Sequence, residues 1–152
     1  VSEYLDKQVL TPRQAVPTLS NAMDVGNPSN FVRILEIFNH AFPGLKDELS
    51  SYTITDTETL NTIREVNEKY NYLLDPHGAV GYLSLQKYLA DHPSAKGIFL
   101  ETAHPVKFPG AVEKSTGIKI EIPSSLAGLM QLEKRSSKMG SSFDELKGCL
   151  LS

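Results

Sequence analysis

A short apolar run, 97-GIFLET-102, constrains the fold of this chain more than any other feature. Helical patterns precede and follow it, and a continuous apolar run between helices is typical of a strand in a parallel sheet covered on both faces. The stretch 118-IKIEI-122 alternates apolar and polar residues, as a half-buried strand does, and a short strand is also expected at 52–54. The order of helices and strands indicates an α/β layered architecture.

Local signals place the helices around these strands. A stripe of Phe31, Ile34, Leu35 and Phe38 predicts a helix that Asn27 or Ser29 caps and that Pro43-Gly44 ends. Residues 1–20, before it, are predicted to be irregular. The capping box 55-TDTE-58 opens a helix that runs to about residue 70.

Proline and a second capping box mark the later helices. Asp75-Pro76 is a cap followed by proline at the first helical position, and it opens a helix over 77–92. A short helix is predicted over 109–115 and a longer one over 125–138. The pair Ser142 and Glu145 predicts a last helix over 143–151.

The composition limits the kinds of partner. The chain has 152 residues, of which 40% are apolar and 22% charged, and its net charge is −3, which argues against a nucleic-acid surface. Its apolar runs are too short to cross a membrane. The single cysteine, Cys149, excludes an internal disulfide and fits a cytoplasmic location. The chain begins at Val1 without methionine, and we expect it to be a piece of a longer protein.

Three polar clusters are candidate sites. Thr102, His104 and Lys107 follow the predicted strand 97–102, and ligands bind beyond the carboxyl ends of such strands. From spacing alone, capping of the turn is the simpler interpretation. The stretch 20–33 carries Asn27, Asn30 and Arg33 at a helix start, where free N–H groups bind anions. An elaborate cap and turn explains this stretch equally well.

The third cluster is 74-LDPHGAVG-81. Its carboxylate and imidazole, Asp75 and His77, are weak indications of acid–base chemistry, and a helix cap is the simpler interpretation of Asp75. We expect no metal site, because the four histidines do not form an i, i+4 pair. From the residues alone, the chain is a soluble α/β protein with polar loops at its strand ends.

Three segments together resemble one family. The stretches 18-TLSNAMDVGNPSNFVRI-34, 74-LDPHGAVGY-82 and 100-LETAHPVKF-108 resemble the C-terminal part of threonine synthases of the bacterial and fungal type, in order and in spacing. The resemblance covers residues 4–125 and implies a pyridoxal-phosphate lyase of the tryptophan-synthase-β-like fold, also called fold type II. It also implies the conversion of O-phosphohomoserine and water to threonine and phosphate, a step of threonine biosynthesis.

The resemblance also implies roles for single residues. Thr102 matches the hydroxyl that hydrogen-bonds the pyridine nitrogen of the cofactor, and a hydroxyl cannot keep that nitrogen fully protonated. The other cofactor-side residues would be Asp75, His77 and His104. The substrate side would include Asn27, Asn30, Arg33 and Lys107.

What the resemblance requires is only partly present. The lysine that forms a Schiff base with the cofactor belongs to an earlier motif that the chain lacks, and the surroundings of Lys46 do not match it. We therefore expect residues 1–152 to be a C-terminal fragment of the enzyme domain, inactive alone, with the upstream half as its partner. Apolar faces meant for that half predict self-association. A related phospholyase, or a non-catalytic interaction module on the same scaffold, is the alternative.

Overall fold

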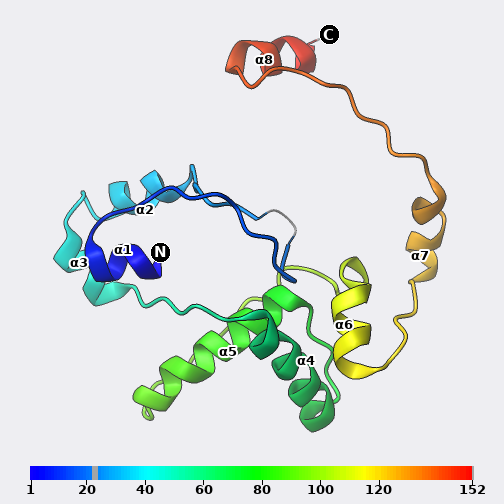
Figure 1. Cartoon of the computed structure of the whole chain (residues 1–152), viewed down its shortest axis with the longest axis horizontal. Coiled ribbons are helices and arrows are strands. Elements are labelled where there is room, and N and C mark those ends of the chain that lie inside the picture. The colour runs from blue at the N-terminus through cyan, green and yellow to red at the C-terminus, as the bar shows by residue number, and fades with distance from the viewer. Residues whose placement is uncertain (22–23, 152) are drawn as a thin grey trace. The chain divides into compact units, whose positions relative to one another are not determined.

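The computed structural model describes residues 1–21 and 24–151, without the side chain of Met130. These residues form two units, Val1–Glu121 and Ile122–Ser152, which are described separately below. The helices of the first unit, labelled in Figure 1, are α1 (Ser2–Lys7), α2 (Phe31–Ile37), α3 (Phe42–Glu48), α4 (Asp56–Tyr70), α5 (Pro76–Asp91) and α6 (Pro109–Thr116). A 3-10 turn, η1 (Pro105–Lys107), precedes α6.

The core of the first unit lies where α4 packs against α5 and α6 (Figure 1). Its fully buried side chains are aliphatic, and burying one such side chain contributes about 1.5–3 kcal/mol. Aromatic rings close this core at its edge, where Tyr82 and Phe99 meet edge-to-face with their centroids 5.5 Å apart. The buried cluster consists of Ile63, Val66, Leu74, Ala79 and Val112.

The predicted starts of α4, α5 and α6 are confirmed. At α4 the backbone N–H of Thr55 donates to Glu58 Oε2 over 2.8 Å, and the N–H of Glu58 donates back to Thr55 Oγ1 over 3.2 Å. Glu58 also forms an ion pair of 2.8 Å with Lys87 of α5, which joins the two helices. Proline stands in the first turn of both α5 and α6, where no backbone N–H is required. Gly117, with a φ of 73°, ends α6.

The helix predicted after residue 30 is shorter than expected. Helix α2 ends at Ile37 because Asn39 and His40 take left-handed φ angles of 48° and 57°. Pro43 then stands in the first turn of α3, so the prediction that it ends the preceding helix is wrong. The predicted caps Asn27 and Ser29 are wrong too: the cap position is Asn30, whose side chain makes no capping hydrogen bond.

The irregular start predicted for residues 1–20 contains one helix, α1. An i, i+4 ion pair of 3.2 Å between Lys7 and Glu3 supports it. Tyr4 packs edge-to-face on Phe31 and Phe42, with centroids 4.9 and 5.8 Å away. This aromatic contact with α2 and α3 is not visible in the sequence pattern of residues 1–20, because it is made with distant residues.

The predicted strands at 52–54, 97–102 and 118–122 are not formed in the part of the chain that the structure describes. The segment 97–101 has the side-chain alternation of a strand: Phe99 packs on the core, while Ile98 and Leu100 are 90% and 76% exposed. Its backbone makes no hydrogen bond to another described segment. A strand needs a paired neighbour, so an apolar run cannot become one alone, and the α/β sheet is absent from these residues.

The second unit contains α7 (Ser124–Ala127), the 3-10 turn η2 (Leu129–Gln131) and α8 (Phe143–Leu151). The capping box before α8 is confirmed, with Ser142 Oγ and Glu145 Oε2 2.9 Å apart. The predicted helix over 125–138 is wrong beyond η2, and residues 132–140 are exposed. Helices this short are marginal in water without a buried face, and α7 buries none of its residues.

Candidate functional site

The start of α5 holds a buried carboxylate, Asp75, at the position that the sequence predicts as a cap. Its side chain is 0% exposed. Asp75 Oδ1 accepts the backbone N–H of Gly78 over 2.9 Å, and Oδ2 is 2.9 Å from Nδ1 of His77. The His77 ring also lies against Phe108, with centroids 5.0 Å apart. The structure thus joins Asp75 and His77, as the sequence predicts, and holds the imidazole from two sides.

A second carboxyl group, Glu101, lies at the same helix start. Its Oε1 accepts the backbone N–H of Asp75 over 3.2 Å, and its Oε2 is buried without a hydrogen-bond partner within the described residues. Gly78 makes this contact feasible: a Cβ there would lie closer than 3.0 Å to both carboxyl oxygens of Glu101. Sequence reasoning missed Glu101. The available signal was an acidic residue that ends an apolar run, together with a glycine in the first turn of a helix.

The two carboxyl groups shift each other's pKa in opposite directions. Burial, followed by the neighbouring Asp75 carboxylate, raises the pKa of Glu101 from 4.5 to about 7. For Asp75, burial acts to raise the pKa, but hydrogen bonds from the Gly78 N–H, from Glu101 and from His77 outweigh it and lower the pKa below 3.8. Near neutral pH Asp75 is therefore ionised, while Glu101, with a pKa of about 7, is close to half protonated.

A pocket of about 400 Å³ lies beside Glu101, and neither Thr102 nor Lys107 lines it. Thr102 is exposed, and its hydroxyl makes no hydrogen bond within the described residues. His104 Nδ1 accepts the N–H of Val106 over 3.1 Å and caps η1, so the turn is capped by His104 and not, as the simpler interpretation predicts, by Thr102. Lys107 ends η1 and is exposed. The pocket is lined by Tyr72, Leu73, Glu101, Ala103, His104, Pro105, Lys119, Ile120 and Glu121.

The predicted substrate-side residues lie elsewhere in the first unit. Asn27, Asn30 and Arg33 are exposed at and around the start of α2, and within the described residues no hydrogen bond joins them to the start of α5. Asp24, from the same stretch, instead accepts the hydroxyl of Thr18 over 2.9 Å. The structure therefore brings together the second and third sequence segments, but not the first.

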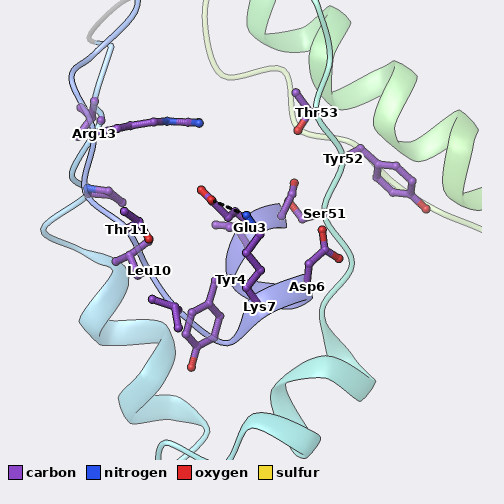
Figure 2. A pocket seen from close by; sticks show the side chains of 16 residues that line it. Glu3, Tyr4, Asp6, Lys7, Leu10, Thr11, Arg13, Ser51, Tyr52 and Thr53 are labelled. Carbon is purple, nitrogen blue, oxygen red and sulfur yellow. Dashed lines mark hydrogen bonds and ion pairs between the residues drawn. The ribbon is translucent and has the colours of Figure 1, made fainter.

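A larger pocket, with a volume of about 680 Å³, lies away from this site. α1, the segment after it and residues 51–53 line this pocket (Figure 2). Arg13 extends into it, while Lys7 is paired with Glu3. Positive and negative side chains are balanced on its walls, so it has no clear preference for a charged ligand.

The described residues form neither a metal centre nor a membrane-spanning helix. No group of three or more histidine, cysteine, aspartate or glutamate side chains is placed to hold a metal ion there. Among the described helices, none has the length and apolar character needed to cross a bilayer.

Comparison with known proteins identifies relatives along nearly the whole chain. The sequence profile of the family "Threonine synthase, C-terminal" matches residues 78–149. The threonine synthase of Haemophilus influenzae is 40% identical over 99% of this chain, and that of Escherichia coli is 36% identical over the same share. The chain spans only 35% and 34% of the length of these relatives.

Solved structures agree with the sequence comparison. The crystal structure of threonine synthase from Escherichia coli matches 99% of this chain and 34% of its own, at 36% identity and a TM-score of 0.81. The yeast enzyme matches 88% of the chain and 36% of its own, at 26% identity and a TM-score of 0.72. A third, described as PLP-bound threonine synthase from Brucella melitensis, matches 88% and 33% at 29% identity, with a TM-score of 0.64. By sequence and by fold, the chain is similar to the C-terminal part of threonine synthases.

Proposed function

We propose that this chain is the C-terminal portion of a pyridoxal-phosphate-dependent threonine synthase, a cytoplasmic lyase. The intact enzyme would convert O-phosphohomoserine and water to threonine and phosphate. The observation that carries the proposal is the match to threonine synthases over 99% of the chain. The 152 residues alone are expected to be inactive, because the lysine that anchors the cofactor and the glycine-rich phosphate loop would come from another part of the protein.

The residues at the start of α5 and after Glu101 fit one edge of the cofactor. Thr102 offers an exposed hydroxyl that is not engaged by the described residues, and a hydroxyl can hydrogen-bond a pyridine nitrogen without giving it a full proton. When bound, pyridoxal phosphate supplies an electron sink for carbanion chemistry. Asp75 and His77 would lie on the cofactor side, and His104 would fix the loop that carries Thr102.

The exposed apolar side chains of the first unit support a sheet in the intact enzyme. Ile98 and Leu100 extend from an unpaired backbone, and a strand from the upstream half would cover them and complete the α/β layers of the tryptophan-synthase-β-like fold. In this proposal residues 1–152 are one part of a larger enzyme domain. Asn27, Asn30, Arg33 and Lys107, all exposed here, would serve the substrate side once that half is present.

The proposal is tested on the intact protein that contains this chain, by following phosphate release and threonine formation from O-phosphohomoserine. Thr102→Val should weaken cofactor binding and lower turnover, whereas Thr102→Ser keeps the hydroxyl and serves as the matched control. Loss of one hydrogen bond to the cofactor predicts a change of about fivefold or more. Phosphate release without threonine would instead identify a phospholyase. Full activity of the valine variant would show that the role assigned to Thr102 is wrong.

A further inference from the structure

Glu101 is the buried polar group that the proposed function leaves unused. Its Oε1 is occupied by the backbone N–H of Asp75, but its buried Oε2 faces no donor within the described residues. Buried polar atoms in folded proteins nearly always have a partner, so an orphaned oxygen requires an explanation. The Asp75 carboxyl group is itself fully buried and raises the pKa of Glu101, so the two carboxyl groups interact.

A proton on Glu101 would give its buried Oε2 atom a hydrogen-bond partner. A protonated carboxyl group is a donor, and Glu101 can then donate from Oε2 to the Asp75 carboxylate. Asp75 keeps its charge because Gly78 and His77 already donate to it. The pKa values of the two groups shift in the directions that this sharing requires, with Glu101 raised and Asp75 lowered.

The other charged groups that line the pocket beside Glu101 face other partners or solvent. Lys119, which lines the same pocket, is paired with Glu113 over 2.7 Å. The remaining titratable side chains of the pocket are exposed to solvent; they are Tyr72, His104 and Glu121. Two titratable groups at the start of α5, Asp75 and His77, act on the pKa of Glu101.

The state of Asp75 determines the state of His77. An ionised carboxylate only accepts hydrogen bonds, so the neutral His77 ring must carry its proton on Nδ1, the atom 2.9 Å from Asp75 Oδ2. Its Nε2 is then an acceptor, and it makes no hydrogen bond within the described residues. The His77 side chain is 31% exposed, so this acceptor can be reached by a ligand.

We propose that Glu101 is a positioning residue: by sharing a proton with Asp75 it fixes this carboxylate, which holds His77 with Nδ1–H bonded and Nε2 open to a hydroxyl or ammonium group of a bound substrate. The inference deepens the proposed function, since it assigns His77 an acceptor role on the cofactor side of that site. Gly78 is part of the same device, because any side chain there would exclude the Glu101 carboxyl group.

The test uses the 152-residue chain without cofactor, labelled with ¹⁵N-histidine and ¹³C-glutamate, in NMR titrations from pH 5 to 9. Spectra of Glu101→Gln and His77→Gln assign the two signals. One glutamate carboxyl should titrate near neutral pH and be missing from Glu101→Gln, and neutral His77 should carry its proton on Nδ1. Glu101→Gln should keep this tautomer, because an amide N–H still donates to Asp75. Glu101→Ala should shift the tautomer ratio toward Nε2–H by about fivefold, the loss of one hydrogen bond.

Glu121→Gln is the matched control, since it removes an exposed glutamate from the same pocket and should change neither signal. The inference is overturned if no glutamate titrates near neutral pH, or if Glu101→Ala leaves the His77 tautomer ratio as it is in the unchanged chain. If Glu101→Ala does not fold, the test rests on Glu101→Gln: the glutamate signal that titrates near neutral pH must be missing from its spectrum. Neither signal depends on cofactor or turnover, so a failure of the proposed enzyme activity would leave both unchanged.

Discussion

Replacing Glu101 with glutamine tests how the buried carboxyl pair makes stability depend on pH. In the folded chain the pKa of Glu101 is raised from 4.5 to about 7, by burial and by Asp75. Between these two values the folded chain holds a proton that the unfolded chain has released. The free energy of unfolding therefore falls as the pH rises, and this contribution is fully present only below pH 4.5.

The size of the effect follows from the two pKa values. The interval from 4.5 to about 7 corresponds to a ceiling of about 3.4 kcal/mol, at about 1.36 kcal/mol per pH unit. Glu101 is partly exposed, so water screens the interaction, and we expect about half of this ceiling, ~1.5 kcal/mol. Asp75 acts in the opposite sense: its lowered pKa contributes stability above pH 3.8 that is lost in stronger acid.

Urea unfolding followed by circular dichroism at pH 5, 6, 7 and 8 measures this dependence. With a slope of about 2 kcal/mol per molar urea, the unfolding midpoint of the unchanged chain should fall by ~0.8 M over this range relative to Glu101→Gln. The two proteins differ only at residue 101, so the difference between the two curves isolates Glu101. If the midpoints of the two proteins ran parallel from pH 5 to 8, the carboxyl pair would not share a proton in the folded chain.

Three further changes probe the packing. Gly78→Ala places a Cβ where the Glu101 carboxyl group lies and should lower the free energy of unfolding by about 1–2 kcal/mol at pH 5.5. In a chain that already carries Glu101→Ala, the same change should cost much less. Equal costs in the two backgrounds would refute the coupling between Gly78 and Glu101. Ile63→Ala empties a fully buried core position and should cost about 2–5 kcal/mol by urea unfolding; a cost below about 1 kcal/mol would contradict the core assignment. Leu100→Ser should reduce the self-association expected of the chain, measured by light scattering, and a strictly monomeric unchanged chain would rule that expectation out.

Local signals in the sequence predict the helices well when the signal and the structure lie within one turn. The capping box of Thr55 and Glu58 and the Asp75-Pro76 start depend only on neighbouring residues, and both are found in the structure. The helix predicted over 125–138 instead ends at Ala127, where Gly128 is a local stop signal that the prediction did not use. Its apolar spacing alone was not enough, because no described residue of α7 is buried against a partner.

The strands and part of the site depend on distant residues. The run 97–102 has the composition of a buried strand, but pairing needs a second strand that the described residues do not contain. Glu101 reaches Asp75 across 26 positions of the sequence, and no spacing rule connects them. The sequence pattern marks Thr102, Asp75 and His77 as candidates, and only the family resemblance implies a role for them beside a cofactor.

The extended segment 97–101 also has a consequence for how the protein assembles. Helices α4 and α5 follow one another in the sequence and pack together, and contacts of short sequence separation form early in folding. Phe99 attaches the segment to this helical cluster while its backbone hydrogen-bonding groups remain open. Folding would thus proceed in two stages, a fast helical stage and a slower stage in which a strand docks on an edge that is already in place, and the second stage would limit the rate.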